Sequence, residues 1–503
     1  MIDYKSLKSG TDIRGTAVKT NEKEIALTDE AVLNIAASFS QWLSKKTGKN
    51  TENLTVAIGR DCRISGERIR NAAAKGLTGS GVNVIDCGLS STPSMFMITL
   101  DHDVDGTIQI TASHHPYQLN GLKFFTKDGG LQGNDISEIL KICESSDPDL
   151  TKHGSVTNLD YMDEYCNSLR KMIVRGVGAN DEKTALEGFH IVVDAGNGVG
   201  GFYAEKVLKP LGADVTGSVF LDPDGMFPNH IPNPENPDAM ESIKKAVLNS
   251  GADLGLIFDT DVDRAGCVDN KGNEINRNRL IALASVMALE KYPGGTIVTD
   301  SVTSTGLKKF IEQIGGKHYR YKRGYRNVIN KAIELTEAGN VAPLAIETSG
   351  HAAFKDNYFL DDGAYLMTRT VILLASLKKQ GKSIENLIGS LEEPYETCEL
   401  RMEINEKDFR TYGEKVLEEL DHYAKVKQGW SIADDNREGI RVFCDSSCGN
   451  GWFLLRLSVH DPVMPLNVES NEQGGCLKMV KQVKEFLDNY PELNFEQIDS
   501  YLM

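Results

Sequence analysis

FHIVVDAGNGVGGFYAEKVLKPLGADVTG, residues 189–217, indicates the fold class of this 503-residue chain. A short apolar strand ends at Asp194, a glycine-rich turn follows, and an amphipathic helix then leads through Gly to another strand. Residues 54–88 and 295–321 repeat the pattern around Asp61 and Asp300. Continuous apolar runs that alternate with helices are typical of parallel strands covered on both faces. The repeats predict three related α/β domains in series, and we interpret the three acidic residues as turn or cap residues rather than catalysts.

The last hundred residues follow a different pattern. Residues 415–425 and 476–490 read as helices, and residues 438–445 and 451–459 read as paired strands, which predicts a smaller α+β domain. We therefore expect four domains, over residues 1–160, 161–275, 276–395 and 396–503. Residues 222–240 are rich in Pro and Asn, so we predict a long ordered loop there, of the kind that often lines a site.

Composition and charge exclude several classes of protein. The net charge is −17, from 55 Lys and Arg against 72 Asp and Glu, which argues against a general nucleic-acid binder but allows a small anionic substrate in a locally positive site. Because no apolar run approaches the roughly 18–20 residues that span a bilayer, we expect no membrane partner. Nine cysteines without a framework spacing, and a beginning that resembles no targeting segment, predict reduced thiols and a cytoplasmic protein.

An aspartate cluster follows a strongly apolar strand in ADLGLIFDTDVDRAG, residues 252–266. Asp259, Asp261 and Asp263 repel one another at this spacing, and a cation with a preference for oxygen ligands, such as Mg²⁺, would compensate. An EF-hand loop is excluded because Arg264 and Asn270 stand where it needs Gly and Glu. A solvated acidic turn, or an aspartyl-phosphate enzyme that uses Asp259 as phosphoryl acceptor, remains possible from these residues alone. Arg264 could hold a phosphate oxygen, or simply pair with the aspartates.

A candidate nucleophile lies in DGTIQITASHHPYQLNGLKFF, residues 105–125. Ser113 follows a predicted strand beside His114 and His115, and Lys123 comes ten residues later. A serine hydroxyl needs a proton acceptor to act as a nucleophile, and an ammonium group offsets the charge of a phosphate. No Gly-x-Ser-x-Gly elbow surrounds Ser113, so an esterase is not indicated. His114 is the first candidate for proton transfer and Lys123 the second.

Two later segments carry polar groups that suit substrate binding. PLAIETSGHAAF, residues 343–354, offers carboxylate, hydroxyl and imidazole groups for the hydroxyls of a sugar: Glu347, Ser349 and His351. GWFLLRLSVHDPVMPLNVES, residues 451–470, places three alternate residues on one face of an extended strand end: Arg456, Ser458 and His460. Those three side chains would form a donor-rich pocket for a phosphate.

These motifs, in this order, resemble the α-D-phosphohexomutase family over essentially the whole chain. The family's serine loop, T-x-S-H-x-P followed by N-G-x-K, is matched by Thr111, Ser113, His114, Pro116, Asn120, Gly121 and Lys123. Its metal loop, D-x-D-x-D-R, is matched by residues 259–264, and its sugar loop, E-x-S-G-H, by residues 347–351. The segment GTDIRG at residues 10–15 resembles the family's opening, which implies that Arg14 enters the catalytic site.

Two segments depart from the family pattern. The family's phosphate loop reads R-x-S-G-T-E-P, whereas residues 456–462 read RLSVHDP, so His460 replaces a threonine. RYKRGYRNVINK, residues 320–331, departs from a shorter V-G-x-K pattern. Arg326 falls where the family has its lysine, and we expect it to contact the substrate phosphate, with Lys322 or Arg323 nearby.

The resemblance implies both a fold and an activity. It implies three related α/β domains with mixed sheets and a C-terminal α+β domain of the TATA-binding-protein-like kind, around a central cleft. The implied activity interconverts hexose 1-phosphate and hexose 6-phosphate, with glucose or mannose as the sugar, through a phosphoserine and a hexose 1,6-bisphosphate. The expected ligands of Mg²⁺ are Ser113, Asp259, Asp261 and Asp263, and hexose 1,6-bisphosphate would act as activator.

Several alternatives remain open from the sequence. A phosphoglucosamine mutase has a related sugar loop, and an aspartyl-phosphate sugar phosphatase would use Asp259. A sugar-phosphate-binding protein with a decayed site is a further alternative. A monomer and a homodimer are equally compatible with the sequence.

Overall fold

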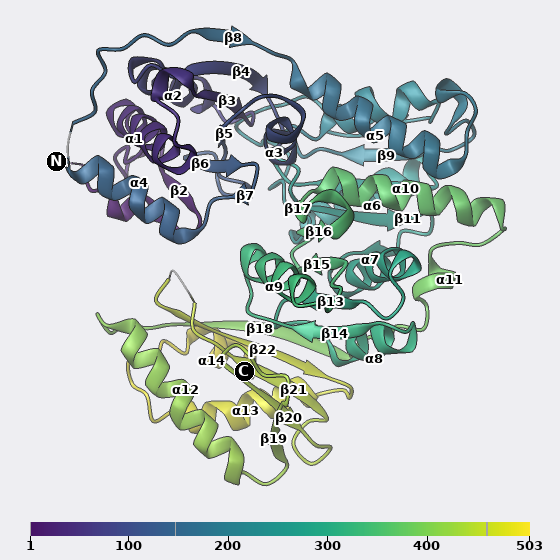
Figure 1. The fold of residues 1–503 in the computed structure, drawn as a ribbon. Helices are drawn as coiled ribbons and strands as arrows, with labels where there is room; N and C mark the ends of the chain where they lie inside the picture. The colour runs from purple at the N-terminus through teal and green to yellow at the C-terminus, as the bar shows by residue number, and fades with distance from the viewer. Residues whose placement is uncertain (1, 146, 459–460) are drawn as a thin grey trace. The chain divides into compact units, whose positions relative to one another are not determined.

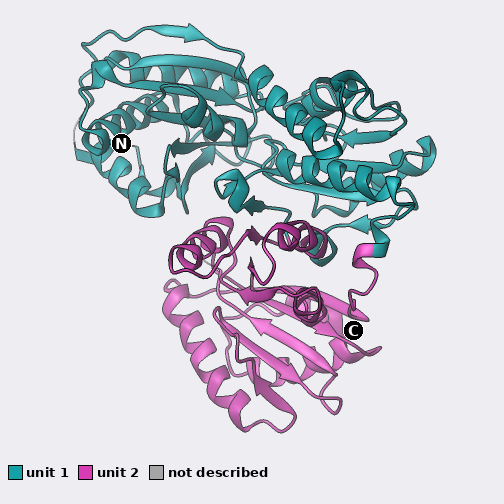
Figure 2. Cartoon of the chain, turned by 45° about the vertical axis from the view of Figure 1, so that its right-hand side comes forward, with its two compact units in different colours: residues 1–280, 349–386 teal, residues 281–348, 387–503 magenta. Residues whose placement is uncertain are grey.

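The computed structural model describes residues 2–145, 147–458 and 461–503, and it divides into two compact units (Figure 2). Unit 1 comprises residues 1–280 and 349–386, and unit 2 comprises residues 281–348 and 387–503. The chain thus leaves unit 1 within α7 (Arg277–Lys291) and returns to it after β15 (Leu344–Ile346). A second passage into unit 2 lies within the short helix α11 (Glu385–Ile388).

The first sheet of unit 1 is mixed, with the strand order β1-β2-β6-β5-β3-β4-β8 and β7 paired to β6 (Figure 1). Strands β3, β4, β5 and β8 run parallel, whereas β1, β2, β6 and β7 pair in antiparallel fashion. The bounds are β1 (Lys8–Ser9), β2 (Asp12–Thr16), β3 (Thr55–Arg60), β4 (Asn83–Leu89), β5 (Gly106–Ile110), β6 (Leu119–Thr126), β7 (Gly129–Gly130) and β8 (Val156–Asn158).

Helices cover both faces of this sheet. Phe124 and Phe125 of β6 point to opposite faces, as successive strand residues must. Phe124 belongs to the core shared with α1 (Asp29–Thr47), α2 (Gly66–Gly79) and α4 (Gly133–Ser145). Phe125 instead packs with Phe96 of α3 (Thr92–Asp101). The carboxyl ends of β3 and β5 are therefore held between two helical layers, and the loop that contains Ser113 begins there.

The second sheet of unit 1 carries the aspartate cluster between two of its strands. Its order is β12-β11-β10-β9, with β9 and β10 parallel and the other pairs antiparallel. The bounds are β9 (Ile191–Asp194), β10 (Leu254–Phe258), β11 (Ala265–Asp269) and β12 (Glu274–Ile275). The unit also contains the helices α5 (Tyr161–Val177), α6 (Pro237–Ser250) and α10 (Gly363–Lys379) and the start of α7. Two short strands, β16 (Ala352–Phe354) and β17 (Leu360–Asp361), pair in antiparallel fashion.

Unit 2 contains three parallel strands, which belong to a five-stranded mixed sheet, and a separate antiparallel sheet. Strand β13 (Thr296–Thr299) pairs in parallel with β14 (Lys317–Arg320) and with β15, next to α8 (Thr305–Gln313) and α9 (Tyr325–Glu337). The antiparallel sheet has the order β18-β22-β21-β20-β19. Its strands and helices are β18 (Glu396–Glu403), β19 (Trp430–Ile432), β20 (Ile440–Cys444), β21 (Gly451–Leu455), β22 (Val463–Ser470), α12 (Phe409–Val426), α13 (Gly475–Leu487) and α14 (Glu496–Leu502).

The expected fold class is confirmed, with mixed sheets and a C-terminal α+β region, and the helix expected after Asp194 is present in an unusual form. After Asp194 the chain forms a π-helix, Tyr203–Leu208, and a 3₁₀ turn, Lys209–Leu211, instead of an amphipathic α-helix. Pro210 has no N–H to bond the carbonyl of Lys206, and Arg170 Nη1 donates to that carbonyl over 2.6 Å instead.

The Pro- and Asn-rich segment is irregular, as expected, as far as residue 236. Asn236 then caps α6, and Pro237 occupies its first turn, so the predicted loop ends four residues early. Among residues 2–145, 147–458 and 461–503, no helix combines the length and apolar character needed to cross a membrane.

Candidate active site

Ser113 lies in the loop between β5 and β6, where local contacts hold its backbone in an unusual conformation. Its φ is 53°, which is uncommon for a residue with a side chain. The Ser113 N–H donates to Thr111 Oγ1 over 2.9 Å, which fixes the turn. The hydroxyl Oγ donates to Asp259 Oδ2 over 3.0 Å and lies 3.2 Å from His114 Nδ1. The loop therefore brings the predicted nucleophile to the aspartate cluster and to its predicted proton acceptor.

The aspartate cluster occupies the loop between β10 and β11, where all three carboxylates are buried. One carboxylate oxygen from each of the three residues lies within 4.8 Å of the other two. A solvated acidic turn, the alternative that the sequence allowed, is therefore wrong. Val262, within the cluster, has a φ of 66°, which strains a β-branched residue.

Contacts with the start of α10 hold that strained loop in place. Gly363 N donates to Val262 O over 3.0 Å. A Cβ on Gly363 would stand 2.7 Å from Arg264 O, so glycine is required for this approach. Such strain persists where the surrounding structure determines it, and it concentrates at functional sites.

Lys123 reaches the cluster from β6 and neutralises part of its charge. Its Nζ donates to Asp261 Oδ2 over 3.0 Å and to Asp263 Oδ2 over 2.5 Å, and the side chain is 5% exposed. Thr92, the first residue of α3, adds two bonds that the sequence did not indicate. Its N–H donates to Asp261 O over 2.8 Å, and its hydroxyl donates to Asp261 Oδ2. The sequence SSTPSM around it indicates only a helix start.

The cluster has the properties of a cation site. Among the residues that the structure describes, none donates a hydrogen bond to Oδ1 of Asp261 or to Oδ1 of Asp263, although both atoms are buried. Burial raises the pKa of Asp259 well above its usual value, and the charges of Asp263 and Asp261 add to this effect. Burial also opposes charge on Asp263, but Lys123 and the neighbouring cations hold its pKa well below the usual range. Buried oxygens without donors and mutually repelling carboxylates fit a hard divalent cation.

Two histidines next to Ser113 are held in their neutral forms. The rings of His114 and His115 stack with their centroids 4.9 Å apart. The positive charge of Arg264, followed by burial, lowers the pKa of His114 far below its usual value. Burial, followed by the charge of Arg14, lowers the pKa of His115 to about 4. Neutral His114 offers a ring nitrogen beside Ser113 Oγ, while the positive charge of Arg264 and burial oppose its protonation.

The two predicted arginines of unit 1 lie beside these groups. Arg14 of β2 stands opposite Gly121 of β6, and its Nη2 lies 2.9 Å from Asp12 Oδ2. Arg264 Nε lies 3.9 Å from Asp259 Oδ2, and Arg264 Nη1 lies 3.7 Å from Glu235 Oε2. Arg264 thus contacts the cluster, and a role in holding phosphate remains a prediction.

His351 lies beside the aspartate cluster in the structure. Its Nδ1 is 3.8 Å from Asp263 Oδ1 and pairs with Asp361 Oδ2. Burial opposes its protonation, but Asp361 and Asp263 outweigh burial and raise its pKa. Asp361 was not anticipated, because FLDDGAY reads as a helix cap. Ser349 is buried in the same segment.

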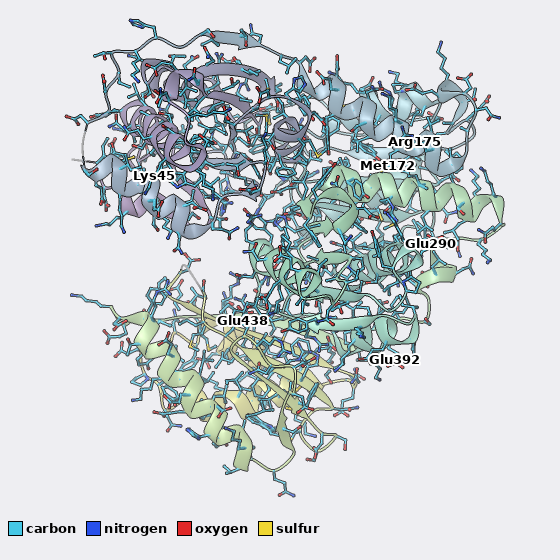
Figure 3. All side chains as sticks on the ribbon, in the orientation of Figure 1. Lys45, Met172, Arg175, Glu290, Glu392 and Glu438 are labelled. Atoms are coloured by element: carbon cyan, nitrogen blue, oxygen red, sulfur yellow. The ribbon has the colours of Figure 1, made fainter. Side chains whose placement is uncertain are left out.

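The remaining predicted residues belong to unit 2. Glu347 Oε1 accepts from Gly324 N over 2.6 Å, and Arg326 lies in the first turn of α9. Glu438, labelled in Figure 3, accepts from Arg323 N over 3.1 Å and from the Ser301 hydroxyl. Burial lowers the pKa of Arg456, which the charge of Glu438 partly offsets and that of Arg323 reinforces.

The phosphate loop is described only in part. Arg456 and Ser458 precede β22, and Ser458 N donates to Val463 O over 2.9 Å. His460, the third predicted phosphate ligand, lies outside the described residues.

Comparison with known proteins gives consistent matches along the chain. Family models of phosphoglucomutase/phosphomannomutase match as alpha/beta/alpha domain I over residues 6–149, domain II over residues 163–272 and domain III over residues 276–395. Phosphoglucomutase from Neisseria meningitidis serogroup A is 32% identical over 484 residues, 96% of each chain. Phosphomannomutase/phosphoglucomutase from Pseudomonas putida is 31% identical over 489 residues, again 96% of each chain. A solved structure of a phosphoglucomutase/phosphomannomutase family protein from Burkholderia thailandensis has a TM-score of 0.80 and 29% identity, and covers 98% of this chain and 99% of that one.

Proposed function

This chain belongs to the phosphoglucomutase/phosphomannomutase family and is a phosphohexomutase, and we propose that it moves a phosphoryl group between the 1- and 6-positions of glucose or mannose by way of Ser113. The resting enzyme would carry the phosphoryl group on the Ser113 oxygen. The sugar phosphate would accept it to form a hexose 1,6-bisphosphate, and the other phosphate would return to Ser113.

The observation that carries the proposal is the position of Ser113 Oγ. It lies 3.0 Å from Asp259 Oδ2 and 3.2 Å from a ring nitrogen of His114, while Lys123 bridges the two other aspartates. A nucleophile, a neutral base and a cation site thus converge from segments that lie 146 residues apart in the chain.

The residues would divide the chemistry as follows. Mg²⁺ held by Asp259, Asp261 and Asp263, with an oxygen on Ser113, would offset the charge of the transferring group. The negative phosphoryl group on Ser113 would offset the positive charge that lowers the pKa of His114, and His114 would then accept the proton of the attacking sugar hydroxyl and return it in the reverse step. Lys123 would hold two carboxylates in place and add positive charge beside the phosphoryl group, and Arg14 and Arg264 would add to that charge.

Substrate recognition is assigned to both units. We expect Arg456 and Ser458 to hold the phosphate that does not react, with Arg326 and His460 in support. Glu347 and Ser349 would bind sugar hydroxyls, and His351 would also contact the substrate. The names of the matched relatives favour glucose and mannose phosphates over the phosphoglucosamine and phosphatase alternatives. Hexose 1,6-bisphosphate would serve as activator by restoring the phosphoryl group to Ser113.

Labelling of Ser113 tests this function directly. Wild-type protein incubated with hexose 1,6-bisphosphate labelled with ³²P should take up label that resists hydroxylamine, as a phosphoserine does. Ser113→Ala should lose the label and nearly all turnover of glucose 1-phosphate and mannose 1-phosphate. Ser40→Ala is the matched control, because buried Ser40 bonds only a carbonyl of its own helix among the described contacts.

The outcomes separate the alternatives. Hydroxylamine-labile label that survives in Ser113→Ala would identify an aspartyl phosphate and overturn the proposal. Full turnover of Ser113→Ala would do the same. A panel of glucose, mannose and glucosamine 1-phosphates assigns the preferred sugar by its kcat/KM.

A further inference from the structure

Arg63 is an arginine buried directly beneath the serine loop, and its guanidinium group is fully satisfied there. Nη1 donates to Pro116 O over 2.7 Å and to Leu119 O over 2.9 Å. Nη2 donates to Ser113 O and to His115 O, each over 2.5 Å. The side chain is 0% exposed. Four of the five N–H donors of Arg63 therefore bond carbonyls of one seven-residue stretch that begins at the nucleophile.

The fifth donor of Arg63 bonds Asp61, which in turn bonds Thr111 just before Ser113. Arg63 Nε donates to Asp61 Oδ2 over 3.1 Å, and Asp61 Oδ1 accepts from Arg63 N over 2.9 Å. Asp61 Oδ2 also accepts from the Thr111 hydroxyl over 2.8 Å, and Thr111 Oγ1 in turn accepts from Ser113 N. Both the N–H and the C=O of Ser113 are thus fixed by one buried ion pair. This explains how a residue with positive φ is held in place.

A second loop covers the guanidinium group from outside. The ring of Phe227, in the Pro- and Asn-rich segment, lies over Arg63 with its centroid 5.2 Å from Cζ. Gly225 forms a bridge with the backbone of Arg63. A Cβ on Gly225 would stand 2.3 Å from Cys62 O and 2.5 Å from Ile64 N, so the approach requires glycine. The cover excludes water from a charge whose bonds to backbone carbonyls are then strong.

From these contacts we propose that Arg63 is a positioning residue for phosphoryl transfer, which holds the Ser113 loop in its reactive conformation with Asp61 as its anchor and the 222–236 loop as its cover. The proposal rests on Ser113 being the phosphoryl carrier. Arg63 acts through the backbone of the loop, because its five donors bond Asp61 and loop carbonyls. Loss of Arg63 would let the Ser113 oxygen move relative to Asp259 and His114, and misplacement of a reacting atom by about 1 Å can cost about 100-fold in rate.

The test compares Arg63→Lys with Arg68→Lys. A lysine keeps the charge of Arg63 but can satisfy at most three of its five acceptors. Arg68 of α2 provides the control because it also donates to two backbone carbonyls, those of Ala17 and Leu27, neither of which belongs to the Ser113 loop. Arg63→Lys should lower both kcat and the rate of ³²P transfer to Ser113 by about 10- to 100-fold, with the KM for glucose 1-phosphate changed less than about threefold. Arg68→Lys should leave kcat within about twofold.

Three outcomes decide the matter. Wild-type protein that takes no label at Ser113 would overturn the proposed function, and with it the role of Arg63. Labelled wild type and a folded Arg63→Lys protein with wild-type kcat would overturn the positioning role alone. If Arg63→Lys does not fold, Gly225→Ala moves the cover and the Arg63 backbone while leaving the guanidinium group intact. A folded Gly225→Ala protein should transfer label at least about fivefold more slowly, and an unchanged rate would overturn the proposal.

Discussion

Lys123→Met should make the stability of unit 1 depend more strongly on a divalent cation than it does in the wild type. The Lys123 ammonium group bonds two carboxylates, Asp261 at 3.0 Å and Asp263 at 2.5 Å, and both are buried. Methionine keeps the apolar stem and a similar length, so the change removes chiefly the charge. Without a bound cation, the variant then buries carboxylates that have lost their ammonium partner.

The size of the effect follows from burial. Removal of one partner of a buried ion pair costs about 3–5 kcal/mol of stability, whereas an exposed pair contributes about 0–1 kcal/mol. Lys49→Met is a matched control, because Lys49 lies 2.6 Å from Asp105 but its side chain is 44% exposed. A cation at about 100 times its Kd adds about 2.7 kcal/mol to either protein by mass action. Lys123→Met also removes a positive charge from beside the cation and should therefore bind it more tightly. At the same Mg²⁺ concentration, the variant should gain more stability than the wild type.

The fluorescence of Trp42, in the core of unit 1, gives the measurement. The other two tryptophans, Trp430 and Trp452, lie in unit 2 and would be replaced by Phe in all variants. In EDTA the urea midpoint of Lys123→Met should fall by at least about 1 M, given a slope of about 1–3 kcal/mol per M, and MgCl₂ should restore most of the loss. A midpoint no lower than that of Lys49→Met, or a loss that Mg²⁺ does not reduce, would refute the reasoning.

Two further changes probe charge in unit 1. Asp259→Asn should raise or preserve the urea midpoint in EDTA at pH 8. Burial and the neighbouring aspartates raise the pKa of Asp259, so its charged form opposes folding above the unfolded-state pKa. Turnover should nevertheless fall by at least about 100-fold, and a lower midpoint would contradict this account. His230 lies 3.0 Å from Asp194, and although burial opposes its charge, that carboxylate raises its pKa. The pair's stabilisation is therefore fully present below about pH 6.5, the usual pKa of histidine, and is lost as pH rises through the raised value. Midpoints measured from pH 6 to pH 9 should fall less steeply in His230→Gln than in the wild type, and parallel curves would exclude the pair as a source of the pH dependence.

The sequence was sufficient for those features that local pattern determines. Apolar strands that end in a polar turn predicted the α/β repeats, and the spacing of Asp259, Asp261 and Asp263 predicted that their carboxylates lie close together. The structure also brings Ser113 and Lys123 to those carboxylates, as the family resemblance implied. The π-helix at residues 203–208 was missed because Pro210 alone does not show which group will bond the carbonyl of Lys206; that donor is Arg170, a residue of another helix.

Contacts made at long range account for the rest of the site. Thr92 bonds Asp261 across 169 positions, and Asp361 pairs with His351 through the turn that joins two short strands. Thr92 and Asp361 each have an adequate local interpretation as a helix start or cap, so neither was identified as part of the site. Arg63 was hidden in the same way, because Asp61 before it has the spacing of a turn residue.

The charges of the site also explain why its chemistry and its assembly are linked. Asp259, Asp261 and Asp263 come from one loop, and groups that neutralise or bond them come from other segments of unit 1: Thr92 from α3, Ser113 from the loop between β5 and β6, Lys123 from β6, and His351 from residues 349–386. Burial of three carboxylates is unfavourable unless those segments meet, so the contacts that place the nucleophile also stabilise the unit. A substitution that removes a charged group therefore alters both properties. Isosteric, charge-specific changes compared with and without Mg²⁺ separate the two properties, because the cation-dependent part of the stability reports on the carboxylate cluster and turnover reports on the position of Ser113.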